Sequence, residues 1–125
     1  MNTSGGSSEA VPEDVIPETA TNQGVRLRDS LDIDRSPEPV APDAFGVYAI
    51  AMEEAGHIEL HLGAARGSMQ VLGEPHALPI GSTLRGGVFY WQPGPGFLGE
   101  YKLQFERPDG TRIPVRVNIV PKRFP

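Results

Sequence analysis

The fold of this chain is decided by residues 88–120, which read VFYWQPGPGFLGEYKLQFERPDGTRIPVRVNIV. In residues 101–106 apolar and polar side chains alternate, and the same alternation returns in residues 113–119. A period of two is typical of strands that have one buried and one solvated face. Residues 108–111 (Pro-Asp-Gly-Thr) separate the two runs and favour a turn, because Gly accepts a positive φ and Pro presets the backbone. The stretch therefore predicts a β-hairpin in an all-β fold.

The composition supports a single domain built from many short strands. The 125 residues suit one domain, and the 15 Gly and 13 Pro suit frequent turns rather than a helix bundle. Cysteine is absent, which excludes disulfides, thiolate zinc sites and a Cys nucleophile. The net charge of −5 comes from the leading part, since residues 1–43 hold nine acids and three bases while residues 44–125 hold seven and eight. No basic stripe predicts nucleic-acid binding.

Targeting and membrane signals are weak in this sequence. The N-terminus lacks a basic region followed by an apolar one, so we do not expect a signal peptide there. No run approaches the ~18 apolar residues of a membrane-spanning helix, so no membrane span is expected.

The chain divides into three expected regions. Residues 1–24 are rich in Ser, Gly, Glu and Pro and predict a disordered acidic tail or linker. Residues 25–43 carry several Pro and predict an extended connector, with a possible edge strand at Val25–Arg28. Residues 44–125 predict a β-sandwich of about seven short strands, with Gly81–Gly87 as a polar link.

Several motifs of the second half match a known pattern. They are Leu78-Pro79-Ile80-Gly81-Ser82-Thr83-Leu84, Gly87-Val88-Phe89-Tyr90-Trp91-Gln92-Pro93 and Gly99-Glu100-Tyr101. Together they resemble the immunoglobulin-like repeats of bacterial surface and secreted proteins, within the cadherin-like superfamily. The resemblance implies an immunoglobulin-like sandwich at the cell surface or outside the cell. It also implies a non-enzymatic spacer, stalk or docking module whose partners are neighbouring domains or another protein of the same assembly.

The candidate binding residues lie around the Pro-Gly segment. Phe89 and Trp91 share one parity and are expected to face inward, where an indole can fill the space between two sheets. The residues left for a partner, either in the loop at Gln92–Gly99 or on the outward face, are Tyr90, Gln92, Phe97 and Leu98. An exposed sheet edge is a second docking mode. The alternative is a glycan site in which aromatic rings of this segment stack on sugars.

The metal-ligand candidates are acidic. Asp29, Asp32 and Asp34 lie beside the Pro-rich connector and could supply oxygens to calcium. His57 and His61 flank Glu59 on one strand face, where the two His would be ~13 Å apart, too far to share one zinc ion. We therefore expect a solvated strand face at these three residues. No cofactor and no catalytic constellation is indicated, so an enzyme is not expected.

Overall fold

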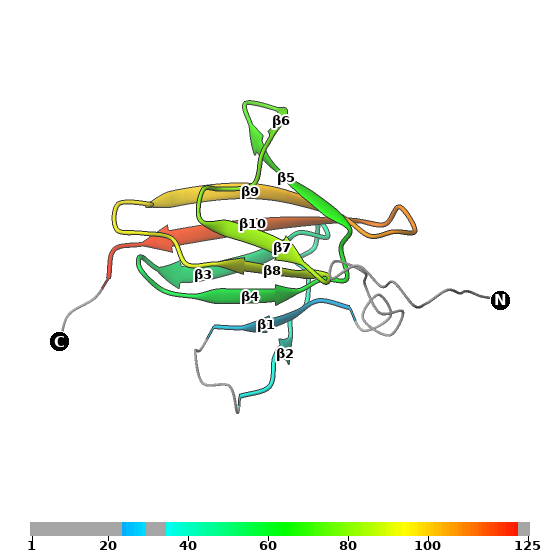
Figure 1. Ribbon diagram of the computed structural model, residues 1–125, viewed down its shortest axis with the longest axis horizontal. Coiled ribbons are helices and arrows are strands. Elements are labelled where there is room, and N and C mark those ends of the chain that lie inside the picture. Colours follow the sequence, from blue (N-terminus) through cyan, green and yellow to red (C-terminus); the bar gives the residue numbers. More distant parts are fainter. Residues whose placement is uncertain (1–23, 30–34, 123–125) are drawn as a thin grey trace.

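The computed structural model describes residues 24–29 and 35–122, and in these ranges the protein is all β, without helix. Ten strands form two sheets of five, stacked as a sandwich (Figure 1). The first sheet has the order β2-β1-β4-β8-β7 and contains β1 (Arg26–Arg28), β2 (Glu38–Pro39), β4 (Ile58–His61), β7 (Ser82–Arg85) and β8 (Val88–Trp91). The second has the order β3-β10-β9-β5-β6 and contains β3 (Tyr48–Glu53), β5 (Arg66–Val71), β6 (Glu74–His76), β9 (Gly99–Glu106) and β10 (Arg112–Val120). The expected β-sandwich is confirmed.

The predicted hairpin is present as β9 and β10, which pair antiparallel from Arg112↔Glu106 to Ile119↔Gly99. Along β10 buried residues alternate with more exposed ones, as the period of two requires. The other side of β10 pairs with β3 in parallel, from Val115↔Tyr48 to Val120↔Glu53. β3 is therefore held at the edge of the second sheet by a strand that lies more than 60 residues later in the sequence.

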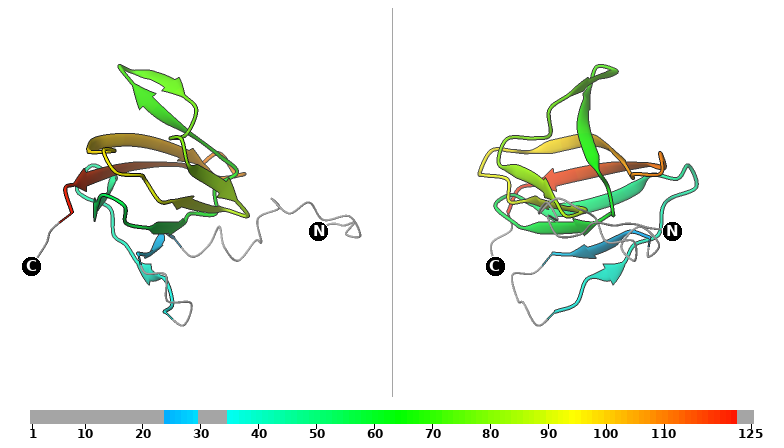
Figure 2. Two further views of the ribbon diagram at one scale, coloured as in Figure 1. Left: turned by 60° about the vertical axis from the view of Figure 1, so that its left-hand side comes forward. Right: turned by 45° about the vertical axis from the view of Figure 1, so that its right-hand side comes forward.

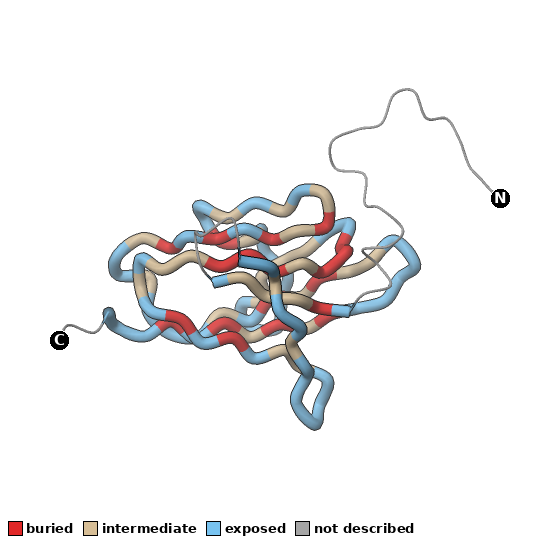
Figure 3. The backbone as a smooth tube through the Cα atoms, turned by 90° about the horizontal axis from the view of Figure 1, so that it is seen from below, coloured by how far each residue is buried: buried red, intermediate tan, exposed pale blue. Residues whose placement is uncertain are grey.

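The core is an aromatic cluster between the two sheets. Phe89 and Trp91 of β8 are fully buried, as expected from their parity, and their partners come from the opposite sheet. The Phe89 and Phe105 ring centroids are 5.2 Å apart, and the Trp91 and Tyr101 rings meet edge-on at 5.2 Å. Figure 3 shows buried residues recurring between exposed ones along the strands. Contacts of this kind join the sheets through their inner faces.

Three strands of the described residues were not expected. β7 lies where Gly81–Gly87 was predicted as a polar link, so that prediction is wrong. β2 and β6 each contain a proline, Pro39 and Pro75, and each lies at the edge of its sheet, where a missing N–H costs no ladder hydrogen bond. The count of ten therefore exceeds the expected seven because short edge strands lack alternating apolar residues.

The segment expected as a connector contributes to the first sheet. β1 pairs with β2 on one side and with β4 on the other, and Val25, just before β1, is only 3% exposed. The backbone N–H of Val40 donates to the carbonyl of Val25, which holds the returning chain beside β1. Residues 1–23, predicted as a tail, lie outside the described residues.

The β5–β6 hairpin extends away from the sandwich (Figures 1 and 2). β6 pairs only with the end of β5, from Met69↔His76 to Val71↔Glu74. Leu72 and Gly73 are the two turn residues, and both have a positive φ, 52° and 82°. This is the backbone of a type I′ turn, which matches the twist of the flanking strands.

Candidate functional site

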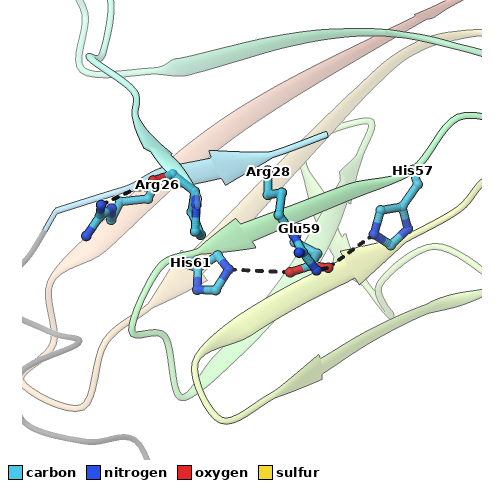
Figure 4. A network of polar contacts seen from close by, with 6 residues as sticks. Arg26, Arg28, His57, Glu59 and His61 are labelled. Atoms are coloured by element: carbon cyan, nitrogen blue, oxygen red, sulfur yellow. Dashed lines mark hydrogen bonds and ion pairs between the residues drawn. The ribbon is translucent and has the colours of Figure 1, made fainter. Parts of the chain in front are cut away.

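The outer face of the first sheet carries a compact polar network centred on Glu59 (Figure 4). Glu59 lies on β4 directly opposite Arg28 of β1, and the Arg28 guanidinium donates a hydrogen bond to Glu59 Oε2. His57 Nε2 lies 3.3 Å from the same oxygen, and His61 Nε2 lies 3.5 Å from Oε1. Because β4 directs alternate side chains outward, His57 and His61 flank the carboxylate from either side along one strand.

Glu59 is buried although it belongs to an outward face. Only 7% of the residue is exposed. Burial alone raises the pKa of Glu59, but the hydrogen bond and positive charge of Arg28, with hydrogen bonds from His57 and His61, more than offset this and hold it below its usual range. The carboxylate is therefore stabilised in its charged form, chiefly by Arg28 of the neighbouring strand.

The prediction of a solvated face is wrong for Glu59. The reason is β1, which lies against β4 and brings Arg28 over the carboxylate. Arg26, the neighbouring outward residue of β1, donates to the carbonyl of Pro37 at 3.1 Å and so ties β1 to the segment before β2. Arg28 and His57 contact Glu59 Oε2, and His61 lies 3.5 Å from Oε1, so the network joins β1 to β4.

The candidate binding residues divide between the sheet face and the loop. Tyr90 lies opposite Glu59 on β8 and is 37% exposed, and Gln92 follows it at the surface. In the loop, Leu98 is 45% exposed, whereas Phe97 is half-buried with its ring edge-on to Trp91 at 6.5 Å. Phe97 therefore closes one end of the core. Tyr90, Gln92 and Leu98 remain accessible to a partner.

The calcium candidates are not brought together in the described part of the chain. Asp29 is exposed just after β1, while Asp32 and Asp34 lie outside the described residues. Within residues 24–29 and 35–122, no group of three or more His, Cys, Asp and Glu has the arrangement of a metal site. No helix that could span a membrane occurs there either.

One exposed feature was missed by sequence reasoning. Leu72, at the tip of the β5–β6 hairpin, is fully exposed and adopts a left-handed backbone conformation. The signal available in the sequence is Leu72-Gly73, a two-residue loop in which Asn-Gly or Asp-Gly would be the usual choice.

Comparison of the chain with known proteins gives no relative. No family model, no curated protein and no solved structure matches it. What the protein does must therefore be inferred from the geometry of its own residues.

Proposed function

We propose that this protein is a non-enzymatic structural and interaction module of the immunoglobulin-like type. The strand order supports this. If β3 to β10 are taken as strands A to G with one added C′ strand, β4-β8-β7 is the B-E-D order of such sandwiches and β5-β9-β10 is their C-F-G order. The motif resemblance in residues 78–101 points the same way and favours a cell-surface or secreted protein of bacterial type.

The observation that carries a spacer role is the path of the chain through the sandwich. Gly24 lies beside Gly63 and Gly87, just beyond the end of β4. At the other end, before β4 begins, the Lys122 backbone N–H donates to Glu54 Oε2 at 3.1 Å. The described chain thus enters at one end of the long axis and leaves at the other (Figure 1). Such a path extends a longer chain by the full length of the domain.

The β3–β10 pairing suits a module under tension. The two strands are parallel, so a pull along the chain draws the start of β3 and the end of β10 in opposite directions. All six register pairs, from Val115↔Tyr48 to Val120↔Glu53, are then loaded together in shear. A pull that separates the two strands from one end would instead load these pairs one after another.

Single-molecule force measurements test the spacer role. Since the chain has no cysteine, Gly24→Cys with Lys122→Cys provides handles for an end-to-end pull. Glu53→Cys with Lys122→Cys is the matched control, because it opens the same β3–β10 pairing from one end. Forced unfolding is governed by the barrier to leaving the native state. We expect this barrier, and so the unfolding force, to be clearly higher in the end-to-end geometry, because that geometry loads all six pairs together. Equal forces in both geometries would count against a spacer that bears tension.

A further inference from the structure

The tip of the β5–β6 hairpin combines two unfavourable choices in one residue. Leu72 has a φ of 52°, and a branched side chain is disfavoured in this left-handed region compared with Gly, Asn or Asp. Leu72 is also 100% exposed, so its side chain gains nothing from burial against the described part of the chain. The type I′ turn requires the positive φ, but it does not require a leucine, and an unfavourable residue kept at such a position is grounds for a functional hypothesis.

Further apolar side chains lie near Leu72 along one flank of the hairpin. Next to it, Val71 is 39% exposed. A groove of about 400 Å³ is lined by these two residues together with Met69, Gln70, Glu100, Tyr101 and Lys102. A partner that receives the tip would therefore also meet half-buried apolar groups along this flank of the hairpin.

The size and charge of the tip identify the kind of partner. Two apolar side chains fall far short of the ~1,200–2,000 Å² that a stable interface between two copies needs, so a second copy docked on the tip alone is not favoured. A single exposed side chain can instead insert into a concave pocket of a partner, where one buried residue can supply most of the binding energy. Residues 69–76 carry one formal charge, that of Glu74, which pairs with Val71 beside the tip. A complementary partner presents a cationic group there.

We propose that the β5–β6 hairpin docks into an apolar pocket of another protein, with Leu72 as the inserted side chain and a cationic group at the pocket rim facing Glu74. This inference rests on the proposed interaction role. It is separable from the spacer role, because the force experiment does not involve the hairpin tip.

The test begins with photo-crosslinking in the cells that make this protein. A photoreactive amino acid replaces Leu72, and in a matched control it replaces Ile80, which is 84% exposed but lies outside the hairpin. A protein trapped from position 72 and not from position 80 is then identified and purified, and its Kd for the full chain is measured by calorimetry. Trapping alone does not support the proposal; the variants below decide it.

Leu72→Asn is the decisive variant, because binding and stability should change in opposite directions. Asn tolerates the left-handed conformation, so we expect the melting temperature to rise by roughly 4–8 °C. The Kd for the trapped protein should weaken by about 10–100-fold. Glu74→Gln should weaken binding by about 3–10-fold and make it less sensitive to salt, and Ile80→Asn should leave the Kd unchanged.

Other results would overturn the docking proposal. These are the absence of a protein trapped specifically from position 72, a Kd that Leu72→Asn leaves unaltered, or equal weakening by Leu72→Asn and Ile80→Asn. A lower melting temperature for Leu72→Asn would show that the leucine serves the fold, and would remove the reason to assign it to a partner.

Discussion

The aromatic core and the Glu59 network join parts of the molecule by opposite means. In the core, the buried Trp91 of one sheet meets the partly buried Tyr101 of the other, and the contact is between aromatic rings. In the network, Glu59 of β4 meets Arg28 of β1 in the same sheet. This contact is ionic and lies on the outer face of that sheet. The first joins layers, whereas the second joins neighbouring strands. Burial of apolar area therefore holds the two sheets together, and paired charge secures β1 beside β4.

The largest effect should follow from Trp91→Ala, which removes the indole at the centre of the core. We expect the free energy of unfolding to fall by ~3–5 kcal/mol, because a large buried side chain leaves a cavity that the sheets cannot fill. Urea unfolding followed by circular dichroism measures it. Tyr90→Ala, one residue earlier but outward, is the control and should cost no more than about 1 kcal/mol. Equal losses at the two positions would contradict the assignment of Trp91 to the inner face of β8 and of Tyr90 to its outer face.

Gly67→Ala should have the next largest effect, although it adds only a methyl group. The new Cβ would lie 2.5 Å from Phe105 Cδ1 and 2.7 Å from Cε1, so the ring must move. We expect a loss of ~1–3 kcal/mol, as for other overpacked cores. Gly94→Ala is the matched control, because nothing lies within 4 Å of its added Cβ. A stability of Gly67→Ala equal to that of Gly94→Ala would mean that Phe105 has room to yield.

Glu59→Gln tests the network and should cost ~1–2 kcal/mol at neutral pH, because Arg28 loses its counter-charge while an oxygen acceptor remains. The pKa of Glu59 is lowered in the folded protein, so its contribution is complete above the unfolded pKa and disappears as the pH falls through the folded value. The difference in stability between wild type and Glu59→Gln should therefore shrink on acidification. Urea titrations at pH 7 and in the acid range measure this difference; a constant value would show that the ionised carboxylate is not what stabilises β1.

Arg66→Gln should have the smallest effect. Arg66 Nε donates to Glu106 Oε1 at 2.9 Å, but 76% of the Arg66 side chain is exposed. Exposed pairs of this kind contribute ~0–1 kcal/mol and are screened by salt. The same urea assay in low and high salt measures the loss. A loss as large as that of Glu59→Gln would remove the distinction between a covered and a solvated ion pair.

The parts of the fold that could be predicted are those in which the apolar residues repeat. β9 and β10 were visible because alternation continues through residues 101–119, and the inward position of Trp91 followed from its parity with Phe89. β10 keeps its pattern across Pro114, which precedes the first residue paired with β3 and so removes no hydrogen bond from that ladder.

The parts that could not be predicted depend on pairing between distant segments. Nothing around His57–His61 indicates that Arg28, 31 residues away from Glu59, will lie over the carboxylate. β7 was missed because Ser82–Arg85 carries one apolar residue, and its place is set by β8 instead. Leu72-Gly73 is a weak signal in the sequence, because it stands out only once the two residues are known to form a two-residue turn with a positive φ.

The parallel pairing of β3 with β10 has a consequence for how the protein is made. β3 is among the earlier strands to leave the ribosome, yet its partner is the last described strand of the chain. Until β10 is synthesised, β3 has no neighbour in its sheet and β9 lacks one of its two ladders. Folding that depends on such distant contacts is slow to begin and exposes unpaired strands meanwhile. The second sheet can therefore form completely only after β10 has been synthesised.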